Sequence, residues 1–239
     1  MTGRSGEPAE VSRRILDPLP VTVSRPLVLL RLGYRSATQV PEKTSRLLDE
    51  EIAACAPLLK ARAVLKSFPI ERDGALVRVG EALQSAGRTL RERLEGCGTA
   101  WLFAATIGDG IEHRAAGLSD RGELTRSLLV DAYGSAAAIA LGLSLEEEIA
   151  RACAPLGLVA TKRTAPGYGD FELEAQRPLV DLLDAVAIGI TVSEDFLMLP
   201  AKSISGVVGG RPPGAGRGAS SHSSGDGPDA DVDPMGAAG

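Results

Sequence analysis

The segment Lys162-Arg163-Thr164-Ala165-Pro166-Gly167-Tyr168-Gly169-Asp170 decides how the chain is interpreted, because it lies between a strand pattern and a helix pattern. Its Pro-Gly and Gly residues favour a tight turn whose small side chains let main-chain groups reach a ligand. Arg163 could hold a planar carboxylate through two parallel hydrogen bonds, a geometry that lysine does not reproduce. The same pattern also fits a structural turn with a surface arginine and a packed Tyr168, so both interpretations are open on the pattern alone.

Strand and helix periodicities both occur around this segment, but they do not alternate regularly. The sequence therefore predicts an α+β fold with a twisted, mainly antiparallel sheet flanked by helices, rather than a doubly wound parallel sheet. The turn Asp73-Gly74 predicts a hairpin between two of the strands. Strands are expected at 27–32, 63–70, 75–79, 101–107, 158–161, 188–192 and 203–208, and helices at 41–59, 89–94, 123–153 and 173–183.

Composition divides the 239 residues into three parts. Residues 1–24 are expected to form a flexible N-terminal segment, and 25–208 to form one folded domain. Residues 209–239 are rich in Gly, Pro, Ser and Asp and cannot bury enough apolar surface to offset the entropy of ordering them. We therefore expect a disordered tail there.

Charge and apolar content exclude several functional classes. The formal net charge of −5 provides no basic field for nucleic acid. No signal peptide is recognisable, and the apolar runs 26–32 and 132–145 are too short to span a bilayer, so we expect a cytoplasmic protein without a membrane partner. Cys55, Cys97 and Cys153 lie far apart and are expected to be reduced and buried, with no metal site.

Two further motifs receive structural interpretations. Asp49, Glu50 and Glu51 are expected to form the solvated face of the helix at 41–59. The segment Thr106-Ile107-Gly108-Asp109-Gly110 ends a strand and starts a helix, where either an anion site or a simple cap is possible. We favour Asp109 as the helix cap.

Three ordered blocks of the sequence resemble a known family. These are the Arg-Thr-Ala-Pro-Gly-Tyr-Gly-Asp loop at 163–170, Thr-Val-Ser-Glu-Asp-Phe-Leu-Met-Leu-Pro at 191–200 and Ser-Ile-Ser-Gly at 203–206. They are similar to the Arg-x-Ala-Pro-Gly-Tyr, Thr-Glu-Ser-x-Ala-Met-x-Pro and Ser-Val-Ser-Gly elements of the activation domain of cobalamin-dependent methionine synthase. Three blocks with similar spacing are more specific than one glycine loop.

The resemblance implies S-adenosylmethionine as the cofactor and places it on the loop. By this motif, Arg163 would bind the carboxylate of the methyl donor, and Ala165, Gly167 and main-chain groups of the loop would contact the rest of it. Tyr168 would lie at the methyl-donor and cobalamin side. The family also uses a glutamate from the preceding long helix near the donor's amino group, and its best match here is Glu147, with Glu146 and Glu148 beside it.

The resemblance also implies a function and partners. It indicates a module for reductive remethylation of a separate cobalamin-dependent methionine synthase or another corrinoid protein, hence a component of a methyltransferase activity in methionine biosynthesis. Cobalamin would enter only through that partner, because no Asp-x-His-x-x-Gly motif occurs in the chain. A flavodoxin-type or iron-sulfur protein would be the reductant. The alternative is a non-catalytic scaffold that docks on a corrinoid protein and has lost donor binding.

Overall fold

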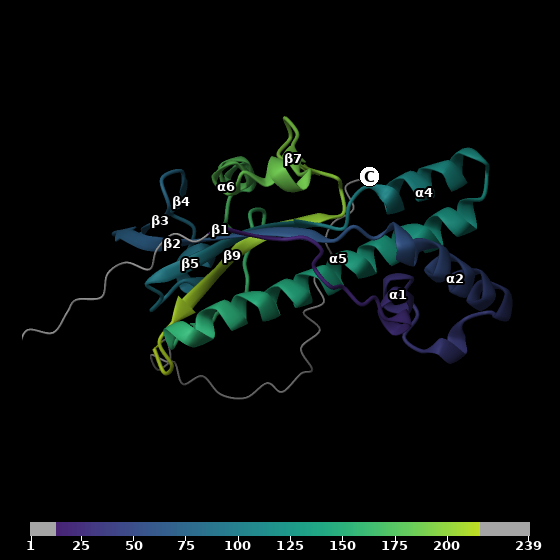
Figure 1. Cartoon of the computed structure of the whole chain (residues 1–239), viewed down its shortest axis with the longest axis horizontal. Helices are drawn as coiled ribbons and strands as arrows, with labels where there is room; N and C mark the ends of the chain where they lie inside the picture. Colours follow the sequence, from purple (N-terminus) through teal and green to yellow (C-terminus); the bar gives the residue numbers. More distant parts are fainter. Residues whose placement is uncertain (1–12, 216–239) are drawn as a thin grey trace, which may run out of the picture.

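The computed structural model describes residues 13–215 of the chain. Figure 1 shows a twisted sheet with helices on both faces and a group of helices beyond one end. The helices are α1 (Arg25–Arg31), α2 (Glu42–Cys55), α3 (Arg88–Arg93), α4 (Gly110–Asp120), α5 (Leu124–Cys153) and α6 (Gln176–Leu183). Short 3-10 turns are η1 (Ala37–Gln39), η2 (Ala56–Leu58), η3 (Ala154–Leu156), η4 (Leu173–Ala175) and η5 (Ala185–Ile188).

The main sheet is antiparallel throughout. Its order is β4-β3-β2-β5-β9-β6, and β1 pairs with β2 on the same edge as β3. The strands are β1 (Arg13–Leu16), β2 (Arg62–Asp73), β3 (Leu76–Val79), β4 (Leu83–Ser85), β5 (Thr99–Thr106), β6 (Val159–Ala160) and β9 (Ser203–Arg211). A separate hairpin joins β7 (Thr191–Val192) to β8 (Met198–Leu199). The predicted α+β class with a mainly antiparallel sheet is confirmed.

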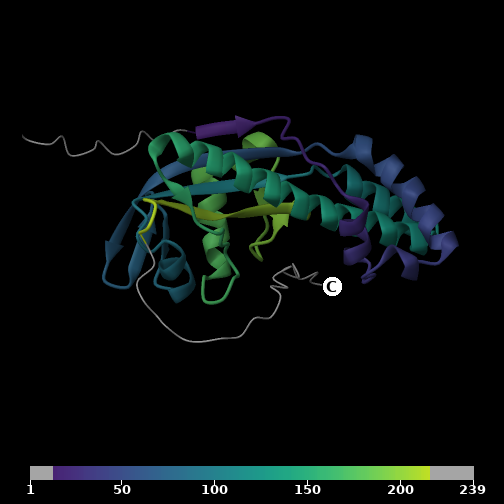
Figure 2. The same ribbon diagram turned by 90° about the horizontal axis from the view of Figure 1, so that it is seen from below.

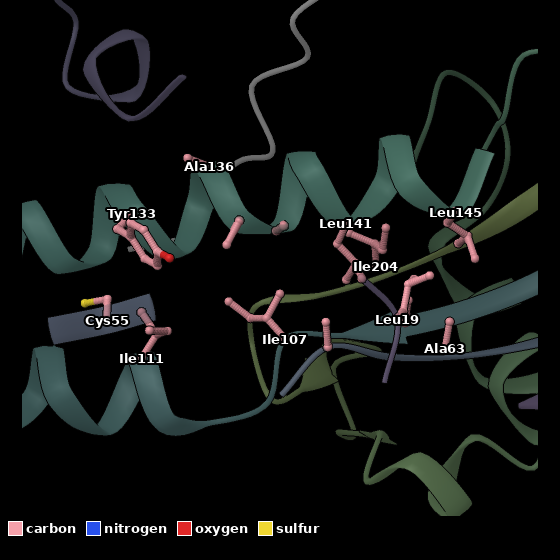
Figure 3. Close-up of a cluster of buried hydrophobic side chains, with 14 of the residues drawn as sticks. Leu19, Cys55, Ala63, Ile107, Ile111, Tyr133, Ala136, Leu141, Leu145 and Ile204 are labelled. Carbon is pink, nitrogen blue, oxygen red and sulfur yellow. The ribbon is translucent and has the colours of Figure 1, made fainter. Parts of the chain in front are cut away.

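Strand β5 explains why the core needs both faces of the sheet. Successive side chains of a strand point to opposite faces. Trp101 and Phe103 face the α5 side, whereas Ala100 and Leu102 face the side of α3 and α6. Because both faces are covered, the strand is apolar without alternation, as the sequence at 101–107 predicted. Figure 3 shows the first of these clusters, with α5 above the sheet.

Helix α5 is the one described helix that is long and apolar enough to cross a membrane. In the structure, however, 67% of its most apolar 18-residue window is buried. Gly134 lets it pack closely, because a Cβ there would lie 2.9 Å from Ile111 Cγ2 of α4. Core packing therefore accounts for its apolar composition.

Two segments differ from the sequence-based expectation. The apolar run 27–32 forms most of helix α1 rather than a strand, with Pro26 in its first turn. A run with five apolar residues in six positions fits a buried strand or a buried helix equally well, so periodicity alone does not decide. The folded part also begins earlier and ends later than 25–208, since β1 lies inside 1–24 and β9 continues to Arg211. Residues 1–12 and 216–239, and with them most of the expected tail, lie outside the described residues.

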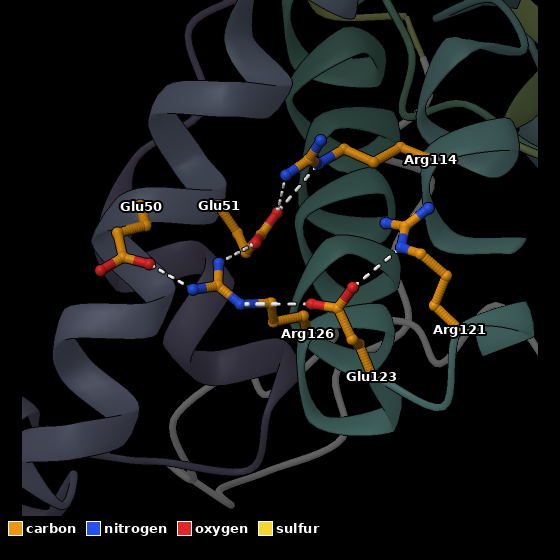
Figure 4. A network of polar contacts seen from close by, with 6 residues as sticks. All are labelled: Glu50, Glu51, Arg114, Arg121, Glu123 and Arg126. Carbon is orange, nitrogen blue, oxygen red and sulfur yellow. Dashed lines mark hydrogen bonds and ion pairs between the residues drawn. The ribbon is translucent and has the colours of Figure 1, made fainter. Parts of the chain in front are cut away.

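The acidic face expected on α2 is partly buried. Glu51 is completely buried and binds Arg114 of α4 with an N–O distance of 2.6 Å, and it also binds Arg126 of α5. Arg126 reaches Glu50 and Glu123 as well (Figure 4). The interpretation of Glu51 as a surface residue was therefore wrong, because helices from distant parts of the sequence cover it.

Candidate functional site

The segment at 162–170 is paired with the outer edge of β9. Thr164 N donates to Val207 O at 3.0 Å, and Val207 N donates to Thr164 O at 2.7 Å. Gly206 makes this approach possible, because a Cβ at this position would lie 2.5 Å from Thr164 O and 2.7 Å from Phe103 Cζ. The loop is thereby fixed to the strand that carries the Ser-Ile-Ser-Gly block.

The turn itself is closed by main-chain hydrogen bonds. Tyr168 N donates to Ala165 O at 3.1 Å, and Gly167 N donates to Phe171 O at 2.8 Å. Gly167 has φ +88°, in the left-handed region that favours glycine. Phe171 is almost fully buried under the turn. The turn is consequently compact, and its hydrogen bond to Phe171 joins it to a buried residue.

The far end of the loop is tied to α3. The carboxylate of Asp170 accepts hydrogen bonds from the backbone N–H groups of Arg88 and Thr89, both at 2.8 Å. These N–H groups belong to the first turn of α3 and have no partner within that helix. Hydrogen bonds from Thr89 and from the Arg88 N–H hold the pKa of Asp170 well below its usual value. Asp170 thus acts as a cap for a helix more than eighty residues earlier in the chain.

Arg163 lies beside α5 and forms an ion pair with Glu146. Arg163 Nε is 3.0 Å from Glu146 Oε1, and the two side chains are 36% and 40% exposed. Gly142, one helical turn before Glu146, provides room for the guanidinium: a Cβ there would lie 2.5 Å from Arg163 Nη1. A cation and an anion therefore stand next to each other on an accessible surface beside the loop.

The predicted site residues do not all come together. Arg163, Ala165, Gly167 and Tyr168 share the one compact turn, with Tyr168 and Ala165 half-buried and Gly167 exposed. Glu147, by contrast, is 70% exposed and binds Arg151 with an N–O distance of 3.1 Å.

Glu146, one residue earlier, is the glutamate next to Arg163. From the sequence, Glu146 was predicted only as a neighbour of Glu147, and no role was predicted for Gly142. The spacing of Gly142 and Glu146, four residues apart on one helical face, was the available signal.

Possible metal ligands and thiols are dispersed in the described part of the chain. Residues 13–215 contain no group of three or more His, Cys, Asp or Glu side chains that could hold a metal ion. Cys55, Cys97 and Cys153 are free and buried. Burial raises the pKa of Cys55 and of Cys153 to about 11, so these thiols are poor nucleophiles at neutral pH.

The fold and the loop together define an α+β domain in which a compact turn is paired with strand β9 of an antiparallel sheet. Residues 96–215 match the family described as vitamin B12 dependent methionine synthase, activation domain. This match covers half of the chain, and the chain belongs to that family. No curated protein matches the sequence significantly.

A solved structure has the same fold. The crystal structure of the MetH reactivation domain bound to AdoHcy is similar with a TM-score of 0.64 and 16% sequence identity. The similarity covers 86% of this chain and 80% of that chain. The structural similarity therefore also includes most of the described residues before position 96, which the family match does not cover.

Proposed function

We propose that this chain binds S-adenosylmethionine on the turn at 163–168 and presents the methyl group to a corrinoid protein. The observation that carries the proposal is the partly exposed pair of Arg163 and Glu146 beside that turn. The amino-acid end of the donor carries one carboxylate and one ammonium group. An arginine and a glutamate side by side offer complementary charges for both.

When the donor binds, Arg163 and Glu146 would each exchange the other for a charged group of the donor. The donor's carboxylate would take the fork of Arg163, and its ammonium group would take Glu146. Because both side chains are partly exposed, neither needs to leave a buried partner before the donor arrives. Ala165 and Gly167 would then contact the donor through main-chain groups, with Tyr168 at the edge of the site.

The chain's part in the reaction would be binding and orientation. S-adenosylmethionine supplies a methyl group on a sulfonium, and the reduced cobalt centre of the partner accepts it, leaving S-adenosylhomocysteine. The fixed turn would hold the sulfonium at the surface, where a partner can approach. The partner would be a cobalamin-dependent methionine synthase or a related corrinoid protein in the cytoplasm, with a flavodoxin-type or iron-sulfur protein as electron source.

Titration calorimetry with S-adenosylmethionine tests donor binding. Loss of the guanidinium in Arg163→Ala should weaken binding by more than about tenfold, equivalent to about 1.4 kcal/mol. Glu146→Gln should weaken binding less strongly, because it keeps a hydrogen-bond acceptor. Glu147→Gln is the matched control, one residue away and turned toward Arg151, and should bind like the unchanged protein. If Glu147→Gln weakens binding while Glu146→Gln does not, the assignment of the glutamate is wrong.

A second experiment separates reactivation from scaffolding. A purified corrinoid protein with oxidised cobalt is mixed with the chain, a chemical reductant and donor labelled in its methyl group. Transfer of label to cobalt that depends on the chain and is lost in Arg163→Ala supports reactivation. Co-purification with the corrinoid protein, without donor binding or label transfer, would instead support the non-catalytic scaffold.

A further inference from the structure

A cavity of about 500 Å³ lies at the other edge of the sheet, between the segment that follows β1 and the start of β2. The lining residues are Asp17, Pro18, Leu19, Val21, Ala56, Leu59, Lys60, Ala61 and Arg62. Its volume falls within the range of about 300–1,000 Å³ that is usual for small-molecule sites. The segment from β1 to α1, which forms one wall, runs along this edge in Figure 2.

The lining has two chemically different parts. Pro18, Leu19, Val21, Ala56 and Leu59 form an apolar wall, whereas Lys60 and Arg62, two positions apart in one chain segment, add two positive charges. Asp17 is the one acidic residue of the lining. A cavity with an excess of positive charge is unexpected on a chain whose formal net charge is −5.

The two cations have no anionic partner among residues 13–215. Neither Lys60 nor Arg62 forms a salt bridge with any described carboxylate, Asp17 included. The lining therefore carries two positive charges that no described carboxylate neutralises.

We propose that this cavity binds a small organic anion. The apolar body of the ligand would contact Leu19, Val21 and Leu59, and its carboxylate or phosphate head would contact Lys60 and Arg62. The site is distinct from the turn at 163–168: the cavity adjoins β2, whereas the turn pairs with β9, two strands away in the sheet. Binding at one site can therefore be measured without the other.

Methyl NMR on the whole chain tests the proposal with hexanoate and hexyl phosphate as probes. At least one of these anions should produce saturable shifts of the Leu19, Val21 and Leu59 methyl signals, and the stronger one identifies the head group. Hexanol, which has the same apolar body without charge, should bind about tenfold more weakly if a charge-assisted hydrogen bond is lost.

Charge variants locate the head group. Lys60→Gln and Arg62→Gln should each weaken binding of the stronger anion by about tenfold. Lys60 is exposed, so its variant keeps the fold even if Arg62→Gln does not. Lys43→Gln, at an exposed position of α2, is the matched control and should change nothing. The proposal is overturned if neither anion gives saturable shifts at millimolar concentration, if hexanol binds equally well, or if Lys60→Gln binds like the unchanged protein.

Discussion

The helical end of the molecule and the loop edge each contain an arginine-glutamate arrangement, but the two differ in exposure. At the helical end the Glu51 side chain is 1% exposed and binds two arginines. Beside the turn at 163–168, Glu146 is 40% exposed and pairs with one arginine of the described residues, Arg163. The first carboxylate is closed off from solvent, while the second is accessible to it. Similar residues therefore hold helices together in one region and form a candidate binding surface in the other.

The largest effect on stability is expected from Glu51→Gln. This change leaves Arg114 and Arg126 without their buried counter-charge, which should lower the free energy of unfolding by on the order of 3 kcal/mol. Denaturant titration measures it. Glu50→Gln, whose side chain is 58% exposed, is the matched control and should cost less than about 1 kcal/mol. Equal effects of the two changes would contradict the contrast between buried and exposed pairs.

A smaller loss is expected from Gly206→Ala. The new methyl group would collide with Thr164 O and with Phe103, and overpacking of this kind costs about 1–3 kcal/mol. Because the collision pushes the loop away from β9, donor binding should weaken as well. Gly98→Ala places its methyl group in open space and serves as the control. Unchanged thermal stability of Gly206→Ala would show that the loop is not tightly packed on β9.

Gly142→Ala should separate binding from stability. Alanine favours a helix over glycine by up to about 1 kcal/mol, which offsets the strain of the new contact. The methyl group nevertheless occupies the space of the Arg163 guanidinium, so donor affinity should fall severalfold while the unfolding free energy changes little. Gly117→Ala in α4, where the nearest atom would lie at 3.6 Å, should leave affinity unchanged. Calorimetry on both variants compares them directly.

The smallest effect concerns pH. The folded-state pKa of Asp170 lies below its ordinary value of 3.8, so this carboxylate stabilises the fold above that pH. The contribution is lost as the pH falls below 3.8 toward the folded-state value. Asp170→Asn should therefore destabilise the protein at pH 7 and make a smaller difference at pH 3. Asp195→Asn, in the β7–β8 hairpin, is the control, and a difference for Asp170→Asn that does not shrink in acid would exclude this role.

Much of the fold could be predicted because its elements have strong local patterns. The hairpin of β2 and β3, the strand β5 and the long helix α5 all follow from periodicity and turn residues. Helix α1 could not be assigned in this way, since its apolar run is too short for periodicity to decide. The burial of Glu51 had no local signal, because Arg114 and Arg126 lie 63 and 75 residues away in sequence.

The loop was the predictable part of the candidate site. Its arginine lies three residues before the proline of the Pro-Gly turn, and the structure places them in one compact turn. The glutamate that contacts Arg163 was harder to predict. Successive residues of a helix point about 100° apart, so a difference of one residue changes the side of the helix that a side chain faces. Only the position at which Arg163 meets α5 distinguishes Glu146 from Glu147.

The clamping of the loop at both ends, on β9 and on the start of α3, has a kinetic consequence. A binding surface that already has its final shape loses little chain entropy on complex formation. Association with a donor should then be a single fast step at all concentrations, without a slow rearrangement limiting the rate. Differences in affinity among variants would accordingly arise from how long the complex lasts, not from how quickly it forms.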